Sequence, residues 1–460
     1  MMAGFTRRAC LRLSHSGESD KVWNYGITEA PPRNPTDRYV QPSRQSRCRT
    51  ARVTTSECIL ASPIAPSSAD TVTQGSARVW LLALTVFLVG IDENICIGIL
   101  PAISQGLGVS TAKAGQLTTI FSAVFALWAF TMAAWLSRHS RRRALVAALV
   151  VFTLSNAAAA AAPSYAWLFA ARIAMAASCA TIVLLCSRLA TEITPPKYHG
   201  RAVGIIFMGI SGSLVFGVPL GMTLEHWAGW RSVFIAIALA SAPLIAILWR
   251  ALPHTAPPVA LTLRAYVKAL ARPHLLAAQG VTITMLAGHF TLFAYLAPYL
   301  QATLGPSPDA LSLLFLAFGV AGVAGAWLGG LGADRAGPTR SLLGCPLLFL
   351  IAMAGVPLAA SLPGDGLPRA AIFVAAMMVW GCLSWSISPV VQNFLIRTAP
   401  HDADANVGVN VAAMHVGVAL GAGAGGALID TASIALMPWA GCALVVLAVA
   451  LAAFAIRKPR

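Results

Sequence analysis

The sequence predicts an all-α membrane protein with twelve transmembrane helices in two pseudo-symmetric six-helix bundles. Of its 460 residues, 57% are hydrophobic and only 10% are charged, whereas about a quarter of the residues in a typical soluble domain are charged. From Val79 onward, apolar runs long enough to cross a bilayer follow one another closely. Basic residues fall in the short loops between these runs, mostly in alternate loops, as in multi-pass membrane proteins.

Each membrane-crossing segment, here called a span, needs about 20 apolar residues at about 1.5 Å of rise per residue. We predict spans 1 to 6 at 79–102, 114–136, 144–162, 165–190, 201–223 and 231–251. Spans 7 to 12 are predicted at 275–300, 310–332, 340–361, 369–396, 405–429 and 433–456.

The spans divide the chain into four parts. Residues 1–76 are rich in Arg, Ser, Thr and Pro and have too few apolar side chains for a core, so we expect a disordered extension. The extension lacks the apolar run of a secretory signal; an organelle transit peptide and a stretch upstream of the natural start stay open. A first bundle at 77–251, a cytoplasmic connector at 252–273 and a second bundle with a short tail at 274–460 follow.

Loop charges orient the chain in the membrane. Basic residues concentrate in one set of alternate loops and in the tail, whereas the opposite loops hold only Lys113, Arg231 and Arg369. Because basic loops stay in the cytoplasm, both termini are expected there. The chain itself is expected in the cell inner membrane. The basic set includes Arg138, Arg141, Arg142, Arg143, Arg188, Lys197, Arg201, Arg250, Arg264, Lys268, Arg272, Arg335, Arg340, Arg397, Arg457, Lys458 and Arg460.

Composition also excludes several function classes. The net charge of +16 does not gather on one soluble segment, so a nucleic-acid partner is not expected. The nine cysteines are scattered without metal-ligand spacing, and we expect no metal and no cofactor. No phosphate-binding loop or catalytic arrangement of Ser and His is present, so an enzyme and an ATP-driven pump are disfavoured.

Charged residues inside spans are costly, which makes each one a functional candidate. Span 1 contains Asp92 and Glu93, and span 4 contains Arg172. Glu93 and Arg172 lie at a similar depth from the same side of the membrane, so we predict that they pair. We expect Glu93, with Asp92 as the second candidate, to carry a coupling proton; a static ion pair that locks spans 1 and 4 is the alternative.

Other polar or aromatic residues inside spans are candidates for a substrate cavity, although ordinary packing and interhelical hydrogen bonds explain them as well. This set consists of Phe125, His289, Tyr295, Gln392, Asn393, Asn410 and His415.

Small residues mark close helix contacts in span 5. Gly217 and Gly221 flank Pro219, which bends a helix because it lacks an N–H, and glycines let neighbouring helices approach closely. The pairs Gly325 and Gly329, and Gly421 and Gly425, repeat this spacing. We expect Gly217, Pro219 and Gly221 to lie at a helix interface.

Several longer motifs resemble the major facilitator superfamily, specifically its drug:proton antiporter branch of sugar-, nucleoside- and chloramphenicol-efflux carriers. The resemblance covers about 78–456. It rests on Glu93 with Gly98 and Pro101, Phe216–Gly221 followed by Gly229–Arg231, Ala287–Phe290 with Tyr295, Pro298 and Tyr299, Gly330–Gly337, and Ala399–Asp404. In the first half, the matching loop Ser137–Arg143 lacks the usual Asp, and His415 stands where the branch more often has Asn.

The resemblance implies the major facilitator fold and proton-coupled efflux of a small organic solute by alternating access. It further implies a gating role for Arg142, Asp334, Arg335 and Gly337. The expected partners are a small-molecule substrate, protons and the lipid bilayer, with the chain acting as a monomer. Uptake or uniport by the same fold, and a non-transporting membrane receptor, stay open as alternatives.

Overall fold

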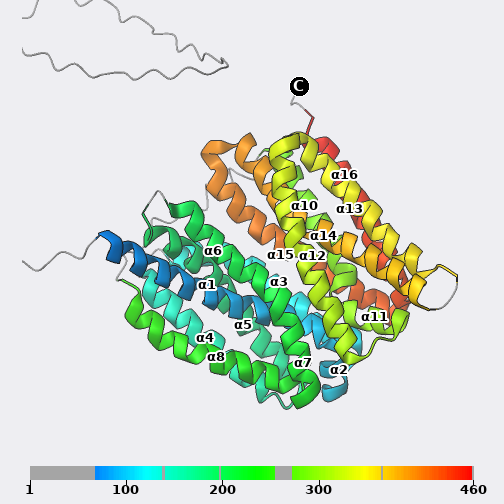
Figure 1. Cartoon of the computed structure of the whole chain (residues 1–460), viewed down its shortest axis with the longest axis horizontal. Coiled ribbons are helices and arrows are strands. Elements are labelled where there is room, and N and C mark those ends of the chain that lie inside the picture. The colour runs from blue at the N-terminus through cyan, green and yellow to red at the C-terminus, as the bar shows by residue number, and fades with distance from the viewer. Residues whose placement is uncertain (1–67, 137–139, 196–197, 254–271, 364–365, 458–460) are drawn as a thin grey trace, which may run out of the picture. The chain divides into compact units, whose positions relative to one another are not determined.

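The computed structural model describes residues 68–136, 140–195, 198–253, 272–363 and 366–457, within which every regular element is a helix (Figure 1). The predicted disordered extension lies outside these residues except for 68–76, which form the start of α1, and most of the predicted connector lies outside them as well.

The first bundle contains α1 to α8. Its helices are α1 (Ser68–Gly98), α2 (Leu100–Leu107), α3 (Thr111–Leu136), α4 (Arg141–Ala160), α5 (Tyr165–Glu192), α6 (His199–Gly212), α7 (Val218–Ala228) and α8 (Trp230–Ala251), with a π-helical turn η2 (Ser213–Gly217) between α6 and α7. Span 1 therefore comprises α1 and α2, and span 5 comprises α6, η2 and α7.

The second bundle contains α10 to α16. Its helices are α10 (Pro273–Phe293), α11 (Leu296–Leu304), α12 (Pro308–Ala336), α13 (Pro338–Ala360), α14 (Leu367–Thr398), α15 (Ala403–Thr431) and α16 (Met437–Ala455), with 3₁₀ turns η3 (Pro400–Asp402) and η4 (Ile434–Leu436). Span 7 comprises α10 and α11.

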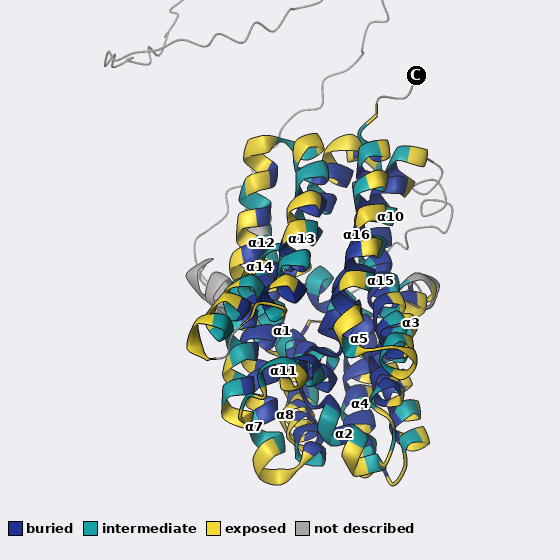
Figure 2. Ribbon diagram, turned by 90° about the vertical axis from the view of Figure 1, so that its right-hand side faces the viewer, coloured by how far each residue is buried: buried dark blue, intermediate teal, exposed yellow. Residues whose placement is uncertain are grey.

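Eleven segments of the described chain are long and apolar enough to cross a membrane. The remaining predicted span is α3, a helix of 26 residues whose one charged side chain, Lys113, lies near its start. Large apolar side chains such as Leu239, Trp327 and Ile351 are exposed on the bundles, where lipid would cover them (Figure 2). The predicted fold class is confirmed.

The two bundles repeat each other in detail. A Cβ at Gly217 or Gly221 would meet Ile91 or Ile95 of α1, so span 5 packs closely on span 1. In the second bundle, a Cβ at Gly421 or Gly425 would meet the backbone of Ala287 or Thr291 of α10, so span 11 packs on span 7 in the same way. The predicted close contact of Gly217 and Gly221 thus lies inside the first bundle.

Spans 1 and 7 also break at equivalent points. The breaks fall at Ile99 (φ −99°, ψ 13°) and Tyr295 (φ −120°, ψ 23°), four residues after Ile95 and Thr291 respectively. The same register places His289, two residues before Thr291, at the position equivalent to Glu93, two residues before Ile95. The short helices α2 and α11 that follow the breaks contact each other across the bundles (Figure 1).

A π-helical turn accounts for close contact between the bundles. Gly319 of α12 lies against η2, where a Cβ would come within 2.9 Å of the Leu214 oxygen and of the Val215 Cα. The turn ends two residues before Pro219, whose missing N–H interrupts the regular α-helical hydrogen bonding. Backbone thus meets backbone at a site that only a glycine on α12 permits.

Close packing in the second bundle makes a substitution pair informative. A Cβ at Gly325 would overlap the Cys382 backbone of α14, whereas one at Gly330, on the same helix, would meet nothing within 4 Å. We expect Gly325→Ala to lower the free energy of unfolding by about 1–3 kcal/mol, as overpacking does. Thermal unfolding in detergent should show a lower midpoint for Gly325→Ala and an unchanged one for the control Gly330→Ala; equal midpoints would contradict the packing described.

Candidate functional site

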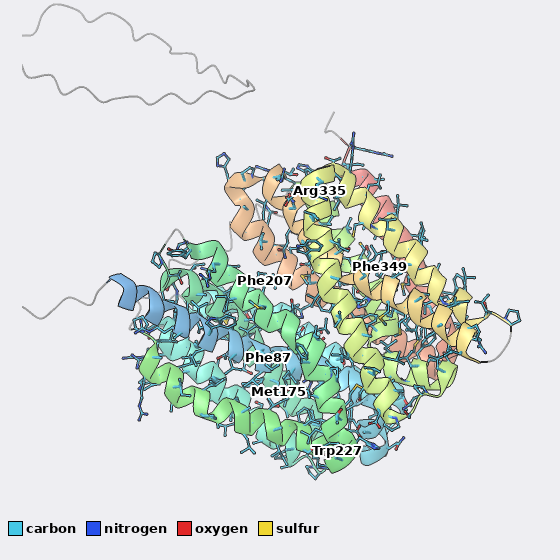
Figure 3. All side chains as sticks on the ribbon, in the orientation of Figure 1. Phe87, Met175, Phe207, Trp227, Arg335 and Phe349 are labelled. Atoms are coloured by element: carbon cyan, nitrogen blue, oxygen red, sulfur yellow. The ribbon has the colours of Figure 1, made fainter. Side chains whose placement is uncertain are left out.

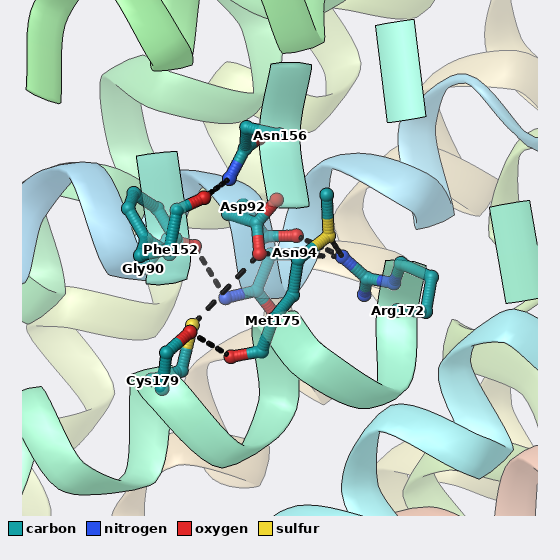
Figure 4. A network of polar contacts seen from close by, with 9 residues as sticks. Gly90, Asp92, Asn94, Phe152, Asn156, Arg172, Met175 and Cys179 are labelled. Atoms are coloured by element: carbon teal, nitrogen blue, oxygen red, sulfur yellow. Dashed lines mark hydrogen bonds and ion pairs between the residues drawn. The ribbon is translucent and has the colours of Figure 1, made fainter. Parts of the chain in front are cut away.

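A buried ion pair lies in the middle of the first bundle. Arg172 Nη1 on α5 is 3.4 Å from Asp92 Oδ2 on α1 and donates a hydrogen bond of 2.9 Å to the Asp92 backbone oxygen (Figure 4). Neither side chain is exposed. The Cys179 thiol lies 3.8 Å from the same carboxylate oxygen as a weak donor. This arrangement neutralises both charges inside the membrane.

The predicted partner of Arg172 was therefore wrong: it is Asp92, and not Glu93. Adjacent residues on a helix point about 100° apart, so only one of the two acids can face α5. Depth along the helix is nearly the same for both residues and cannot distinguish them. Asp92 faces α5, and Glu93 turns toward the second bundle with 31% of its side chain exposed.

Glu93 faces His415 across the boundary between the bundles. Its Oε1 lies 4.0 Å from His415 Nδ1 on α15. The imidazole stacks on Phe125 of α3, with ring centroids 3.6 Å apart and an interplanar angle of 20°. Three candidates from distant spans, Glu93, Phe125 and His415, are thus brought together.

The ion pair and the Glu93 contact belong to one continuous set of contacts. The Arg172 guanidinium lies 4.2 Å from the centre of the Phe121 ring, and Phe121 lies 6.4 Å from Phe125. From Phe125 the contacts pass to His415 and back to Glu93, which adjoins Asp92. Phe121 was not among the predicted site residues, because a lone Phe in an apolar span gives no signal in the sequence.

His289, the counterpart of Glu93, lies in different surroundings. Rings of four helices surround it, with centroids 4.8 Å away for Phe293, 5.0 Å for Trp380, 6.2 Å for Phe349 and 6.4 Å for Phe318. Only 1% of His289 is exposed, and its ring nitrogens have no hydrogen-bond partner among the described residues. His289 therefore belongs to the aromatic core of the second bundle.

The other predicted cavity residues make contacts inside the second bundle or at its edge. Asn410 is fully buried and donates to Gln279 Oε1 and Thr282 Oγ1, both at 2.9 Å. Asn393 donates to Asp334 Oδ1 at 3.2 Å, and Gln392 donates to Ser388 Oγ at 3.1 Å. These side chains are not placed with Glu93.

Tyr295 lies between the bundles, near the start of α3. Its hydroxyl donates to the Ala422 oxygen at 3.0 Å, and a Cβ at Gly115 of α3 would overlap its ring. It borders a cavity of about 370 Å³ between α3 and α15, whose lining also includes Gln116, Thr119 and Asp430. This cavity lies along the same boundary as His415, and Glu93 is not part of its lining.

The gating candidates lie at the end of the bundles that is opposite to α2 and α11. Arg142 donates to the Trp249 oxygen and lies 4.5 Å from the centre of that ring, within the first bundle. Asp334 accepts from Arg397 Nη2 at 3.2 Å, within the second bundle. Arg335 lies in the last turn of α12, whereas Trp227 lies at the far end of the first bundle (Figure 3). Gly337, with φ +82°, joins α12 to α13.

No group of three or more His, Cys, Asp and Glu side chains that could hold a metal ion occurs in the described part of the chain. The charged and titratable groups of the site described above are the Asp92 and Glu93 carboxylates, the Arg172 guanidinium and the His415 imidazole.

The pairing of Asp92 with Arg172 predicts different effects for the two neighbouring acids. Removing the Asp92 carboxylate leaves a buried guanidinium without its counter-charge, which costs about 3–5 kcal/mol in proteins. We expect Asp92→Ala to lower the thermal unfolding midpoint in detergent strongly and Glu93→Ala to change it little. A larger loss for Glu93→Ala would contradict this assignment.

Comparison with known proteins agrees with this architecture. The model of the Major Facilitator Superfamily matches residues 82–407 and 281–460. The chain is 32% identical over 349 residues to the inner membrane transport protein YdhP of Escherichia coli (strain K12), covering 76% of this chain and 88% of that protein. It is 30% identical over 379 residues to the chloramphenicol efflux pump Rv0191 of Mycobacterium tuberculosis (strain ATCC 25618 / H37Rv), covering 79% and 88% respectively.

Among solved structures, a bacterial homologue of the human lysosomal transporter Spinster, in an inward-facing and unoccupied conformation, shares the fold. The TM-score is 0.66 at 20% identity, covering 83% of this chain and 96% of that one. Family and fold thus agree with the resemblance in the sequence and with a multi-pass transporter that is not an enzyme. The chain belongs to the Major Facilitator Superfamily.

Proposed function

We propose that this transporter exports a small organic solute, such as a drug, sugar or nucleoside, in exchange for protons. The observation that carries the proposal is Glu93, a partly exposed carboxyl group in span 1 at the boundary between the bundles. Its neighbour Asp92 is neutralised by Arg172, which leaves Glu93 as the acid whose charge is not balanced by a neighbouring cation.

A carboxyl group at this place suits proton coupling. A charge inside the membrane is costly, so a carrier crosses between its states most easily when the carboxyl is neutralised by a proton or covered by a solute. Glu93 lies where two moving bundles would meet, and such a residue can be exposed to one side of the membrane at a time.

The contacts between the bundles support alternating access. Three contacts lie toward the end of the bundles that carries α2, α7 and α11. They are the packing of Gly319 against η2, of Tyr295 against Gly115, and of Thr119 against Gly423. The basic loops lie at the opposite end, so we assign the α2 end to the outside and both termini to the cytoplasm. In this assignment the described arrangement is closed to the outside.

Efflux is supported by the relatives, one of which is named as a chloramphenicol efflux pump. The proposed partners are the solute, protons and the lipid bilayer of the inner membrane, and the proposed working unit is the single chain. Gating by the Arg142 and Asp334 regions remains part of the proposal.

The test replaces Glu93 by Gln, which keeps the shape of the side chain but cannot ionise. In inverted membrane vesicles with an imposed pH gradient, wild-type protein should accumulate at least one of three radiolabelled probes, chloramphenicol, L-arabinose or inosine. We expect Glu93→Gln to abolish this gradient-driven accumulation, while the half-buried Glu225→Gln on α7 serves as the matched control and keeps it.

Undiminished accumulation by Glu93→Gln would refute the proposed role of Glu93. Accumulation only when the gradient is reversed would instead indicate uptake, and transport that ignores the gradient would indicate uniport.

A further inference from the structure

We propose that His415 prevents slip, which is a change of state by a carrier that holds neither solute nor proton. When the carrier is empty and Glu93 is ionised, His415 holds the two bundles together and keeps the outer side closed. Binding of a proton or a solute at Glu93 would release it. This inference rests on the proposed antiport function and assigns a positioning role to a residue of the second bundle.

The first support is the place of the contact. Among acid–base contacts between described residues, those of Arg141 with Glu192 and Arg172 with Asp92 stay inside the first bundle. Those of Arg272 with Asp402 and Arg397 with Asp334 stay inside the second. The contact between Glu93 and His415 crosses from α1 to α15, so its strength bears directly on whether the bundles separate.

The second support is how the imidazole is held. His415 is 8% exposed, and Phe125 of the first bundle covers one face of its ring. Its Nδ1 is buried and makes no hydrogen bond to another described residue, yet it faces the Glu93 carboxylate at 4.0 Å. A buried polar atom without a partner is costly, and an approach of about 1 Å by Glu93 would satisfy it.

The third support is the dependence of this contact on charge. In the tautomer with its proton on Nδ1, neutral His415 donates to an ionised Glu93, and such charge-assisted hydrogen bonds are about twice as strong as neutral ones. In the state open to the outside the bundles are apart and the contact is broken, so a proton from outside binds the Glu93 carboxylate there and removes its charge. When that proton has left to the cytoplasm, the ionised carboxylate re-forms the contact with His415. No other reactant is consumed.

The consequence of this contact is a tighter coupling of proton entry to solute export. An antiporter wastes the gradient if it changes state while empty and ionised, because protons then enter without solute leaving. A contact that is strong only in that state slows this step and leaves the proton-bound and solute-bound steps free.

The other charged groups around Glu93 do not replace this contact. Asp92 and Arg172 act on Glu93 electrostatically but are paired with each other. The nearby thiols of Cys96 and Cys179 are fully buried, and a thiol cannot supply a positive charge to Glu93. On α3, Lys113 lies over the Tyr165 ring near the start of the helix, two turns or more before Phe125.

The decisive experiment measures proton entry without any solute. The purified full-length chain is placed in liposomes containing the dye pyranine, and a potassium diffusion potential drives protons inward. His415→Phe keeps a ring to stack on Phe125 but has no donor, and we expect it to raise solute-independent proton entry about fivefold or more, the lower end of typical coupling between two sites. A leak equal to that of wild-type protein would overturn the proposal.

Two further variants show whether any leak passes through the proposed contact. His415→Gln retains an N–H donor and should leak less than His415→Phe. The double variant Glu93→Gln with His415→Phe has no proton carrier and should lose the leak. A leak that persists in the double variant would overturn the proposal, because protons would then bypass Glu93.

Closure can be followed directly at the same boundary. A Cβ at Gly423 would lie 3.7 Å from Thr119 Cγ2, so the pair Thr119→Cys and Gly423→Cys reports contact between α3 and α15. We expect the disulfide to form faster at a pH that ionises Glu93 than in acid, after correction for thiolate fraction with a fixed model thiol, and the difference to vanish with His415→Phe. An undiminished difference in that variant would count against His415.

Failure of this inference differs from failure of the proposed function. Loss of gradient-driven export in Glu93→Gln without a leak in His415→Phe would refute only the role of His415. Unchanged export in Glu93→Gln would refute proton coupling at Glu93 itself.

Discussion

The Asp92–Arg172 pair is the interaction on which the polar site depends. A single charge in the interior of a membrane protein is costly, and two opposite charges in contact offset much of that cost. The pair spans α1 and α5, and Arg172 also lies over Phe121 of α3. Three spans of the first bundle are thereby fixed around one neutral centre, from which Glu93 points toward the second bundle.

The pseudo-symmetry of the bundles extends to backbone contacts and breaks, but not to chemistry. Glycines of spans 5 and 11 pack against equivalent residues of spans 1 and 7. Spans 1 and 7 also break at matching positions. Where the first bundle has Glu93 near its ion pair, the second has His289 among aromatic rings. The repeat thus provides the scaffold, and different residues at one equivalent position give the two bundles different chemistry there.

Hydropathy and loop charge were enough to predict the fold, because the exclusion of charge from lipid acts on every residue of a span. The same reasoning correctly identified buried charges at 92 and 172. It did not choose between Asp92 and Glu93 as the partner of Arg172, because neighbouring acids at one depth differ only in which helix they face, and that depends on how the helices pack.

Other predicted cavity residues show that polarity alone does not distinguish a cavity lining from packing. Asn410 satisfies its hydrogen bonds to Gln279 and Thr282 inside the second bundle, and Asn393 binds Asp334 at a helix end. A polar side chain in a span needs a partner, but the sequence does not tell whether that partner is a neighbouring helix or a solute. The contact of Gly319 with η2 was missed for a similar reason, since a π-helical turn has no distinct residue pattern.

The neutrality of the Asp92–Arg172 pair also bears on the energy source. The transmembrane voltage does work only on net charge, at about 2.3 kcal/mol per elementary charge per 100 mV. Moving the pair together with its bundle therefore exchanges no electrical work with the membrane, and in the proposed cycle this work is done on Glu93, its proton and any charge on the solute. Exchange of one proton for an uncharged solute would thus be electrogenic, driven by the voltage as well as by the pH difference.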